Sequence, residues 1–204
     1  MSTAATSKST VYIVDDDQAI RHAMELLMRS VGLDYEIFHS GDDFLSNHSN
    51  DRAGCLVLDI RMPGLGGLEL QEKLNESGST LPVIFITGHG DVPMAVEAMQ
   101  KGAVDFIQKP FRDQELLDRI GEALKTDQER RSAREEKTEV LIRIEKLTNR
   151  ERQVLDLVVT GKPNKVIAYE LGVSQRTVEI HRARVMEKMQ AKSLADLVRM
   201  HLAT

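Results

Sequence analysis

The sequence has very little of several features that define large protein classes. With a single cysteine, Cys55, it cannot form an internal disulfide. Aromatic residues are only 4% of the chain and tryptophan is absent, which argues against a platform that stacks the bases of single-stranded nucleic acid. No apolar run approaches the ~20 residues of a membrane span, and the N-terminus does not resemble a signal peptide. We therefore expect a cytoplasmic protein with no membrane partner.

Charge is distributed unevenly along the chain. Residues 1–139 hold 15 Lys and Arg against 25 Asp and Glu (net −10), whereas residues 140–204 hold 12 against 7 (net +5). A length of 204 residues gives room for one medium domain and a small one, because single domains cluster at roughly 100–150 residues. We therefore expect an acidic N-terminal domain and a basic C-terminal part.

Short apolar runs alternate with amphipathic stretches after a small polar leader, residues 1–10, which we expect to be disordered. The runs typical of strands are residues 11–14, 35–38, 55–59, 83–86 and 105–108. Parallel strands need long, right-handed crossovers, which the helical stretches between the runs supply. The pattern predicts an α/β domain over residues 11–125, a doubly wound five-stranded parallel sheet of flavodoxin-like type. Its site should lie at the carboxyl ends of the strands.

A polar stretch separates this domain from the rest of the chain. From Arg112 a helical pattern continues into residues 126–139, which lack Gly and Pro and are almost wholly polar. Apolar periodicity resumes at Val140. We interpret residues 126–139 as solvated and residues 126–146 as a helical linker.

Capping signals predict a small all-α domain over residues 147–204. Thr148 and Glu151 have the spacing of a capping box that opens a helix ending near Gly161. We expect the N-caps of three further helices at Asn164, Ser174 and Ser193.

Polar residues follow the ends of four predicted strands: Asp15, Asp16, Asp59, Thr87 and Lys109. Because the carboxyl ends of parallel strands meet at one edge, we expect these side chains to share a rim. Crowded carboxylates repel one another unless a cation lies among them, and oxygen ligands without Cys or His suit Mg²⁺. An aspartate can attack phosphorus when a metal, an ammonium and a hydroxyl stabilise the transferring group. These residue types indicate phosphoryl transfer.

Each of these residues also has an ordinary structural explanation. Asp-rich turns such as residues 15–17 usually cap helices, and we interpret Asp17 in that way. The Lys109-Pro110 pair either simply ends a strand or holds a cis bond that aims the lysine, although X-Pro bonds are cis only about 5% of the time.

Competing phosphate chemistries lack their motifs. A phosphatase of the haloacid dehalogenase type needs a second acid two residues after its nucleophile, and that position is Arg61. No GxxxxGK[ST] loop occurs, and GHGDVP at residues 88–93 fails the dinucleotide pattern because Pro93 stands where its third Gly belongs. Nucleotide binding is not expected.

Three stretches, YIVDDD, CLVLDIRMPG and PVIFITGHGDVPMAVEAMQKGAVDFIQKPF, resemble the receiver domain of FixJ-type response regulators. The resemblance covers roughly residues 11–124. It implies that Asp59 accepts a phosphoryl group and that Thr87 and Lys109 contact this group. The ligands that it implies for Mg²⁺ are Asp15, Asp16, Asp59 and the Arg61 carbonyl.

Phe106 matches the switch aromatic of this family, whereas periodicity alone favours an ordinary core aromatic on a strand. The resemblance implies that phosphorylation rearranges Thr87 and Phe106 and promotes a homodimer. The dimer face would combine the helix around residues 94–100 with the strand 105–108. Packing of Met94, Ala95, Ala98 and Met99 on the sheet explains that helix equally well.

Ala168, Gly172 and Val178 have the spacing of two helices that cross through a tight turn. The second helix should run from Ser174 to Met189. Its surface and the helix before it offer a set of candidate DNA contacts: Lys165, Gln175, Arg176, Thr177, Glu179, Ile180, His181, Arg182 and Arg184. The alternative is a small helical bundle with a solvated basic face.

LTNRERQVLDLVVTGKPNKVIAYELGVSQRTVEIHRARVMEKM resembles the LuxR-type helix-turn-helix DNA-binding domain. Glu179 is unusual in mid-helix, and either accepts from cytosine N4 or orients Arg182. We expect His181 to hydrogen-bond phosphate or backbone rather than zinc, because no second His or Cys lies at ligand spacing.

Together the two resemblances predict a two-component response regulator that is not a metabolic enzyme. Its expected partners are a sensor histidine kinase, double-stranded DNA, RNA polymerase and a second copy of the chain, and its expected role is that of a transcriptional activator. The rival hypotheses are an aspartyl-phosphate phosphatase, disfavoured by Arg61, and a phosphorylation-independent DNA-binding or scaffold protein, disfavoured by the complete acidic set.

Overall fold

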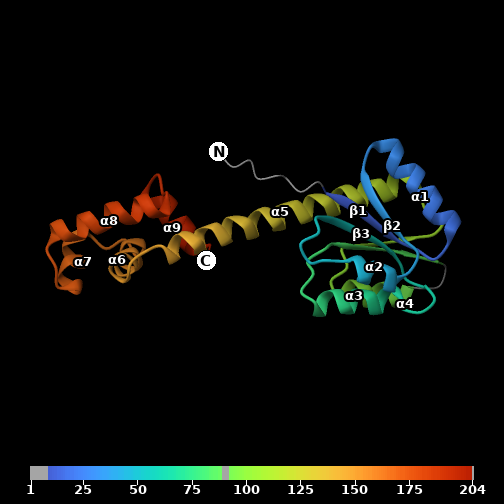
Figure 1. Ribbon diagram of the computed structural model, residues 1–204, viewed down its shortest axis with the longest axis horizontal. Helices are drawn as coiled ribbons and strands as arrows, with labels where there is room; N and C mark the ends of the chain where they lie inside the picture. The colour runs from blue at the N-terminus through green and yellow to red at the C-terminus, as the bar shows by residue number, and fades with distance from the viewer. Residues whose placement is uncertain (1–8, 89–91, 204) are drawn as a thin grey trace. The chain divides into compact units, whose positions relative to one another are not determined.

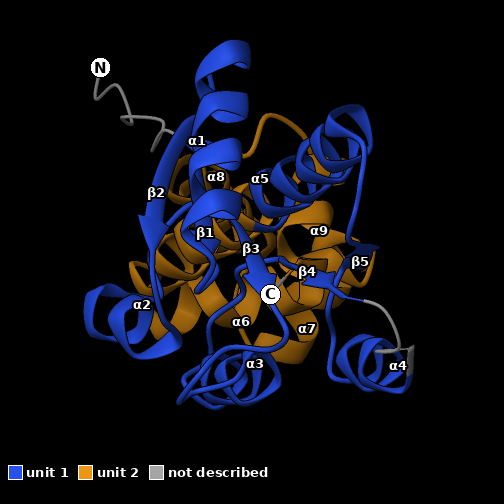
Figure 2. Ribbon diagram, turned by 90° about the vertical axis from the view of Figure 1, so that its right-hand side faces the viewer, with its two compact units in different colours: residues 1–130 blue, residues 131–204 orange. Residues whose placement is uncertain are grey.

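The computed structural model describes residues 9–88 and 92–203, and the chain divides into two compact units, residues 1–130 and 131–204 (Figure 2). The leader expected over residues 1–10 lies almost wholly outside the described residues. Thr10 is an exception, because it is already the first residue of a strand.

The first unit alternates strands with helices throughout (Figure 1). Its elements are β1 (Thr10–Val14), α1 (Gln18–Val31), β2 (Asp34–Phe38), α2 (Gly41–Asn47), β3 (Gly54–Asp59), α3 (Gly67–Glu76), β4 (Val83–Thr87), α4 (Val92–Gln100), β5 (Asp105–Gln108) and the first part of α5 (Asp113–Glu145), a helix that continues into the second unit. Each strand lies within one residue of its predicted bounds.

The strands form one five-stranded sheet in the order β2-β1-β3-β4-β5, and every pair of neighbours is parallel. The predicted α/β fold with a doubly wound parallel sheet is therefore confirmed. The chain crosses outward in one direction from β1 to β2 and in the other direction from β3 onward, so the order reverses between β1 and β3. Side chains at the carboxyl ends of these two strands flank the crevice where such sheets bind ligands.

Successive residues of each strand face opposite layers, and this alternation builds two cores. Val11 and Ile13 pack with the helices α1 and α5, whereas Tyr12 and Val14 pack on the other side with α2, α3 and α4. Figure 2 shows these helices on the two faces of the sheet. Both faces are covered, which explains why β3 and β4 are continuous apolar runs.

Helix α5 is continuous over 33 residues, as the helical linker required. Residues 132–139 are all exposed, but Asp127 is only 2% exposed. Its carboxylate accepts a hydrogen bond of 2.9 Å from the backbone N–H of Gly54. The interpretation of residues 126–139 as solvated is thus wrong at Asp127, because sequence polarity could not reveal that a distant N–H needs this carboxylate.

The second unit contains α6 (Asn149–Val159), α7 (Asn164–Leu171), α8 (Gln175–Met189) and α9 (Leu194–Leu202). Its apolar core also includes Val140 from the end of α5. The capping box of Thr148 and Glu151 is confirmed, as are the N-caps Ser174 and Ser193. None of the helices in the described ranges is long and apolar enough to cross a membrane.

The expected N-cap at Asn164 is wrong. Pro163 occupies the cap position with extended backbone angles, and Asn164 is the first helical residue. The Asn164 side chain instead accepts a hydrogen bond from the Arg182 guanidinium of α8. A tertiary partner therefore uses the oxygen that a cap would have used.

We predict that Asp127→Ala destabilises the first unit by about 1–3 kcal/mol, because it leaves the buried Gly54 N–H without its acceptor. Asp127→Asn retains an acceptor oxygen and should cost less. Urea unfolding of the full chain, with amide hydrogen exchange at Gly54, measures both effects. The matched control is Glu129→Ala, an exposed acid on the same helix. Equal losses in Asp127→Ala and Glu129→Ala would contradict the prediction.

Candidate functional site

The parallel sheet brings the predicted acidic site together at one edge. Asp15 directly follows β1, Asp59 ends β3, Thr87 ends β4 and Lys109 directly follows β5. The expectation that these residues share a rim is therefore confirmed. Asp15, Asp59 and Thr87 are buried, so their polar groups need partners within the protein.

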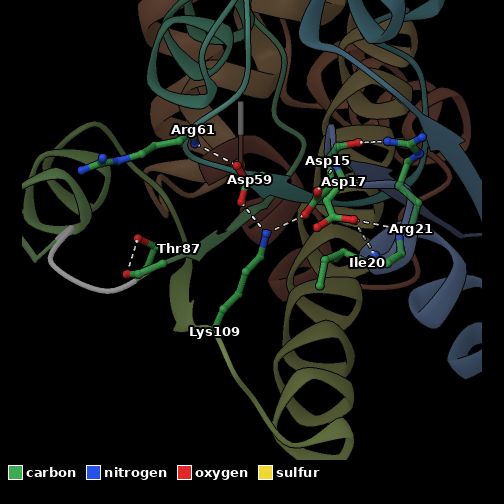
Figure 3. Close-up of polar contacts among 10 residues, drawn as sticks. Asp15, Asp17, Ile20, Arg21, Asp59, Arg61, Thr87 and Lys109 are labelled. Atoms are coloured by element: carbon green, nitrogen blue, oxygen red, sulfur yellow. Dashed lines mark hydrogen bonds and ion pairs between the residues drawn. The ribbon is translucent and has the colours of Figure 1, made fainter.

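Lys109 supplies the central partner. Its ammonium Nζ lies 2.8 Å from Asp15 Oδ2 and 2.6 Å from Asp59 Oδ1 (Figure 3). The peptide bond between Lys109 and Pro110 is cis. One positive charge thus joins two buried carboxylates that come from different strands.

Backbone N–H groups hold the same carboxylates from the other side. Arg61 N–H donates to Asp59 Oδ2 at 2.9 Å, and Asp17 N–H donates to Asp15 Oδ1 at 2.8 Å. The Arg61 side chain itself points away from Asp59 (Figure 3). Asp17 caps α1 by accepting from Ala19 N–H, which confirms its ordinary structural interpretation.

Burial and neighbouring charges have opposing effects on the pKa values of Asp59 and Lys109. Burial raises the pKa of Asp59 above its ordinary value, and the nearby Asp15 charge adds to this, although Lys109 and Arg61 N–H partly compensate. Burial by itself lowers the pKa of Lys109, but hydrogen bonds and attraction from the two carboxylates raise it overall. The ammonium is therefore charged at neutral pH, while a single positive charge leaves the carboxylate pair net negative.

The donor set fits a hard divalent cation in its chemistry. Asp15 and Asp59 contribute carboxylate oxygens, and Asp16 is an exposed carboxylate beside them. Among the residues that the structure describes, no three Asp, Glu, His or Cys side chains already converge as a cation site. Carbonyl oxygens and water would therefore have to complete the coordination of Mg²⁺, which usually keeps several waters.

Gly67 is a site residue that the sequence analysis missed. A Cβ at this position would lie 2.3 Å from the Asp59 carbonyl oxygen, so only glycine allows the first residue of α3 to approach the end of β3. The paired glycines at Gly66 and Gly67 were the available signal. Their role depends on the packing of α3 against the end of β3, a contact between segments that sequence spacing does not give.

Thr87 and Phe106 lie on neighbouring strands but differ in exposure. The Thr87 side chain is 4% exposed, and its hydroxyl donates to the Gly88 carbonyl at 3.3 Å. Phe106 is 42% exposed, whereas the next residue, Ile107, is buried. The interpretation of Phe106 as a core aromatic is therefore wrong. Its register partner Phe85 on the same face is fully buried, but β5 is an edge strand with no further strand beside it in the described part of the chain.

A second candidate site is the pair of crossed helices α7 and α8. Gly172 ends α7 with a φ of +64°, the left-handed conformation that the sequence analysis expected in the turn. Ala168 and Val178 are buried between the helices. The predicted helix-turn-helix geometry is thus present.

The candidate DNA contacts on this element differ in exposure. Those that are exposed are Lys165, Gln175, Arg176, Glu179, Ile180 and Arg184. Thr177, His181 and Arg182 are partly buried. The buried Nδ1 of His181 has no hydrogen-bond partner among the described residues.

Arg182 forms a hydrogen bond within its own domain. Its Nη1 lies 2.9 Å from Asn164 Oδ1 at the start of α7. Glu179 receives a contact of 3.4 Å from Gln175 Nε2. The alternative in which Glu179 orients Arg182 is therefore wrong, because Asn164 does so.

A partly buried ion pair joins α8 to α6. Lys188 Nζ donates to Glu151 Oε2 at 2.6 Å, and Glu151 also accepts from Thr148 N–H in the capping box. Glu151 is 2% exposed. The Lys188 hydrogen bond, with that of Thr148 N–H, lowers the pKa of Glu151 to about 2.

We predict that acid destabilises the second unit through Glu151. Its folded-state pKa of about 2 lies below the ordinary 4.5, so its contribution is complete above pH 4.5 and is lost as the pH falls toward 2. Glu151→Gln should lower stability at neutral pH and flatten this acid dependence. Thermal unfolding of the full chain between pH 2 and 7 measures both. An unchanged acid slope in Glu151→Gln would contradict the assignment.

Comparison with protein-family models finds a match for each unit. The "Response regulator receiver domain" matches residues 11–121, and the "Bacterial regulatory proteins, luxR family" matches residues 145–201.

Individual proteins are similar over nearly the whole chain. Nodulation protein W of Bradyrhizobium diazoefficiens is 48% identical over 198 residues, which cover 97% of this chain and 87% of the relative. Transcriptional regulatory protein FixJ of Rhizobium meliloti is 47% identical over 194 residues, which cover 95% of each. The solved structure of the response regulator StyR has a TM-score of 0.88 at 45% identity and covers 97% of this chain and 100% of that one.

Proposed function

Because the chain belongs to the FixJ-type response regulators, which join a receiver domain to a LuxR-type DNA-binding domain, we propose that phosphorylation of Asp59 switches its activity as a transcription regulator. The family has a regulatory role and not that of a metabolic enzyme. It implies a histidine kinase and DNA as partners. The observation that supports Asp59 best is its buried carboxylate, held by Lys109 and Arg61 N–H at the rim of the sheet.

Asp59 would act as the nucleophile toward a phosphohistidine of the kinase. A carboxylate oxygen forms the new P–O bond, the P–N bond breaks, and its electron pair returns to the imidazole, which takes up a proton. Lys109 and the Thr87 hydroxyl then bind the oxygens of the transferred group. Lys109 already contacts Asp59, and Thr87 ends β4, the strand next to β3.

Asp15, Asp16, Asp59 and the Arg61 carbonyl would hold Mg²⁺. The ion supplies positive charge that offsets the negative charge of the phosphoryl oxygens. The Lys109 ammonium contacts both Asp15 and Asp59, so Lys109 and a bound cation would together neutralise the negative charge of these two carboxylates.

Phosphorylation would act through Thr87 and Phe106 on the surface made by α4 and β5. A phosphoryl group draws the Thr87 hydroxyl inward, and Phe106 then moves from its exposed position toward the vacated space. Ala95 and Ala98 are buried against the sheet, but Val96 and Met99 are 52% and 41% exposed. These two exposed apolar residues of α4, the helix that contacts β5, would form the apolar surface of a receiver homodimer.

Pairing of receivers would bring together two DNA-binding domains, each too small to bind a half-site tightly by itself. Helix α8 would enter the major groove, with Arg176 and Arg184 among its contacts and Lys165 of α7 on phosphate. Recruitment of RNA polymerase by the bound dimer would make the protein an activator.

We predict that acetyl phosphate with Mg²⁺ adds one acid-labile phosphoryl group, and that Asp59→Asn abolishes the addition. The amide cannot form the acyl phosphate, although it preserves the size of the side chain. Mass spectrometry of the intact protein and of its peptides measures the stoichiometry and the site. Equal labelling of Asp59→Asn would refute the acceptor assignment.

We further predict that phosphorylation converts the protein from monomer to dimer, measured by light scattering with and without acetyl phosphate. Val96→Glu should still be phosphorylated but remain monomeric, because it places a charge in the proposed apolar surface. The matched control is Leu26→Glu, which changes a residue of similar exposure on α1 and should dimerise normally. A phosphorylated wild-type protein that stays monomeric would rule out the dimer switch.

A further inference from the structure

Glu179 borders the outward face of α8. A helix turns 100° per residue, so the buried Val178, Val185 and Met189 mark the side that packs on the core. Arg176, Ile180 and Ala183 are exposed on the opposite side, and Glu179 is exposed at its edge. These residues lie in the first two-thirds of the helix, the part that reaches base edges when such a helix enters the major groove.

The charge of Glu179 is not neutralised inside the domain. Within the part of the chain that the structure describes, it forms no ion pair, and its side-chain contact is with the amide of Gln175 at 3.4 Å. Arg182, one turn away, donates to Asn164 instead. A bare carboxylate on a DNA-facing helix repels the phosphates, so it opposes binding to any sequence unless it meets a hydrogen-bond donor.

Only one base presents a suitable edge to a carboxylate. Guanine exposes two acceptors in the major groove, thymine exposes an acceptor and a methyl group, and adenine places the acceptor N7 beside its amino group. Cytosine exposes the N4 amino donor and no acceptor. An acceptor-only side chain therefore discriminates in favour of cytosine and against the other three bases.

We propose that Glu179 is a specificity-determining residue that accepts a hydrogen bond from cytosine N4, so that each half-site carries a cytosine at one defined position. The proposal rests on the proposed function, in which α8 binds duplex DNA. Ile180, 48% exposed beside Glu179, is likewise better suited to a base edge than to phosphate. Arg182 becomes a positioning residue that joins α8 to the start of α7.

The test uses the full chain, phosphorylated with acetyl phosphate and Mg²⁺, to select duplexes from a randomised library. Wild-type protein should select a cytosine at one position of each half-site. Glu179→Ala should lose the preference at that position alone. Glu179→Gln should move it to adenine, because an amide can pair with N6 and N7 together.

Titration with a selected duplex measures the size of the effect. Replacing the cytosine pair should weaken wild-type binding about tenfold and should hardly change the binding of Glu179→Ala. The matched control is Glu187→Gln, an exposed acid two turns further along α8. It removes the same charge and should retain the cytosine. Circular dichroism checks that each variant is folded.

Two failures are distinguishable. If wild-type protein binds no duplex, the proposed function falls and this inference falls with it. If it binds duplex DNA but Glu179→Ala and Glu179→Gln keep the wild-type base preference, the inference alone is overturned.

Discussion

The ammonium of Lys109 lies between the carboxylates of Asp15 and Asp59, and two buried negative charges at one sheet edge would be strongly unfavourable without it. This arrangement requires the carboxyl ends of β1, β3 and β5 to lie at one edge of the sheet. A parallel sheet whose order reverses between β1 and β3 provides it. Both faces of that sheet are covered by helices, so the rim is the part of the strands left for chemistry. The burial that raises the pKa of Asp59 also reduces screening by water, so a charge added at this site interacts strongly with its neighbours.

The second unit uses an ion pair differently. Glu151 and Lys188 join α6 to α8, and their contact stabilises a scaffold on which the exposed face of α8 is presented. Arg182 and Asn164 add a hydrogen bond between α7 and α8. Some polar side chains of α8 therefore stabilise the domain through internal contacts. Others remain exposed and are available to bind a partner.

Helix α5 shows how a polar sequence can still be anchored. Its segment of residues 132–139 is exposed on every side, whereas Asp127 is buried one turn before it and accepts from Gly54 at the start of β3. Asp59 ends the same strand. The strand that carries the proposed phosphoacceptor is therefore hydrogen-bonded at its other end to the helix that leaves the receiver.

The sequence by itself determined the strands, the parallel α/β fold, the shared rim and the helix-turn-helix, because these depend on periodicity, capping and strand order, all of which are local or follow from general rules of chain crossing. Tertiary structure decided which of several possible partners each polar group takes. Asn164 bonds to Arg182 instead of capping α7, Asp127 bonds to Gly54 instead of to water, and Phe106 is exposed on the edge strand although its neighbour Phe85 is buried. These outcomes depend on groups that are distant in sequence but adjacent in space, and a hydrogen bond or a buried surface is decided by the distance between atoms rather than by their separation along the chain.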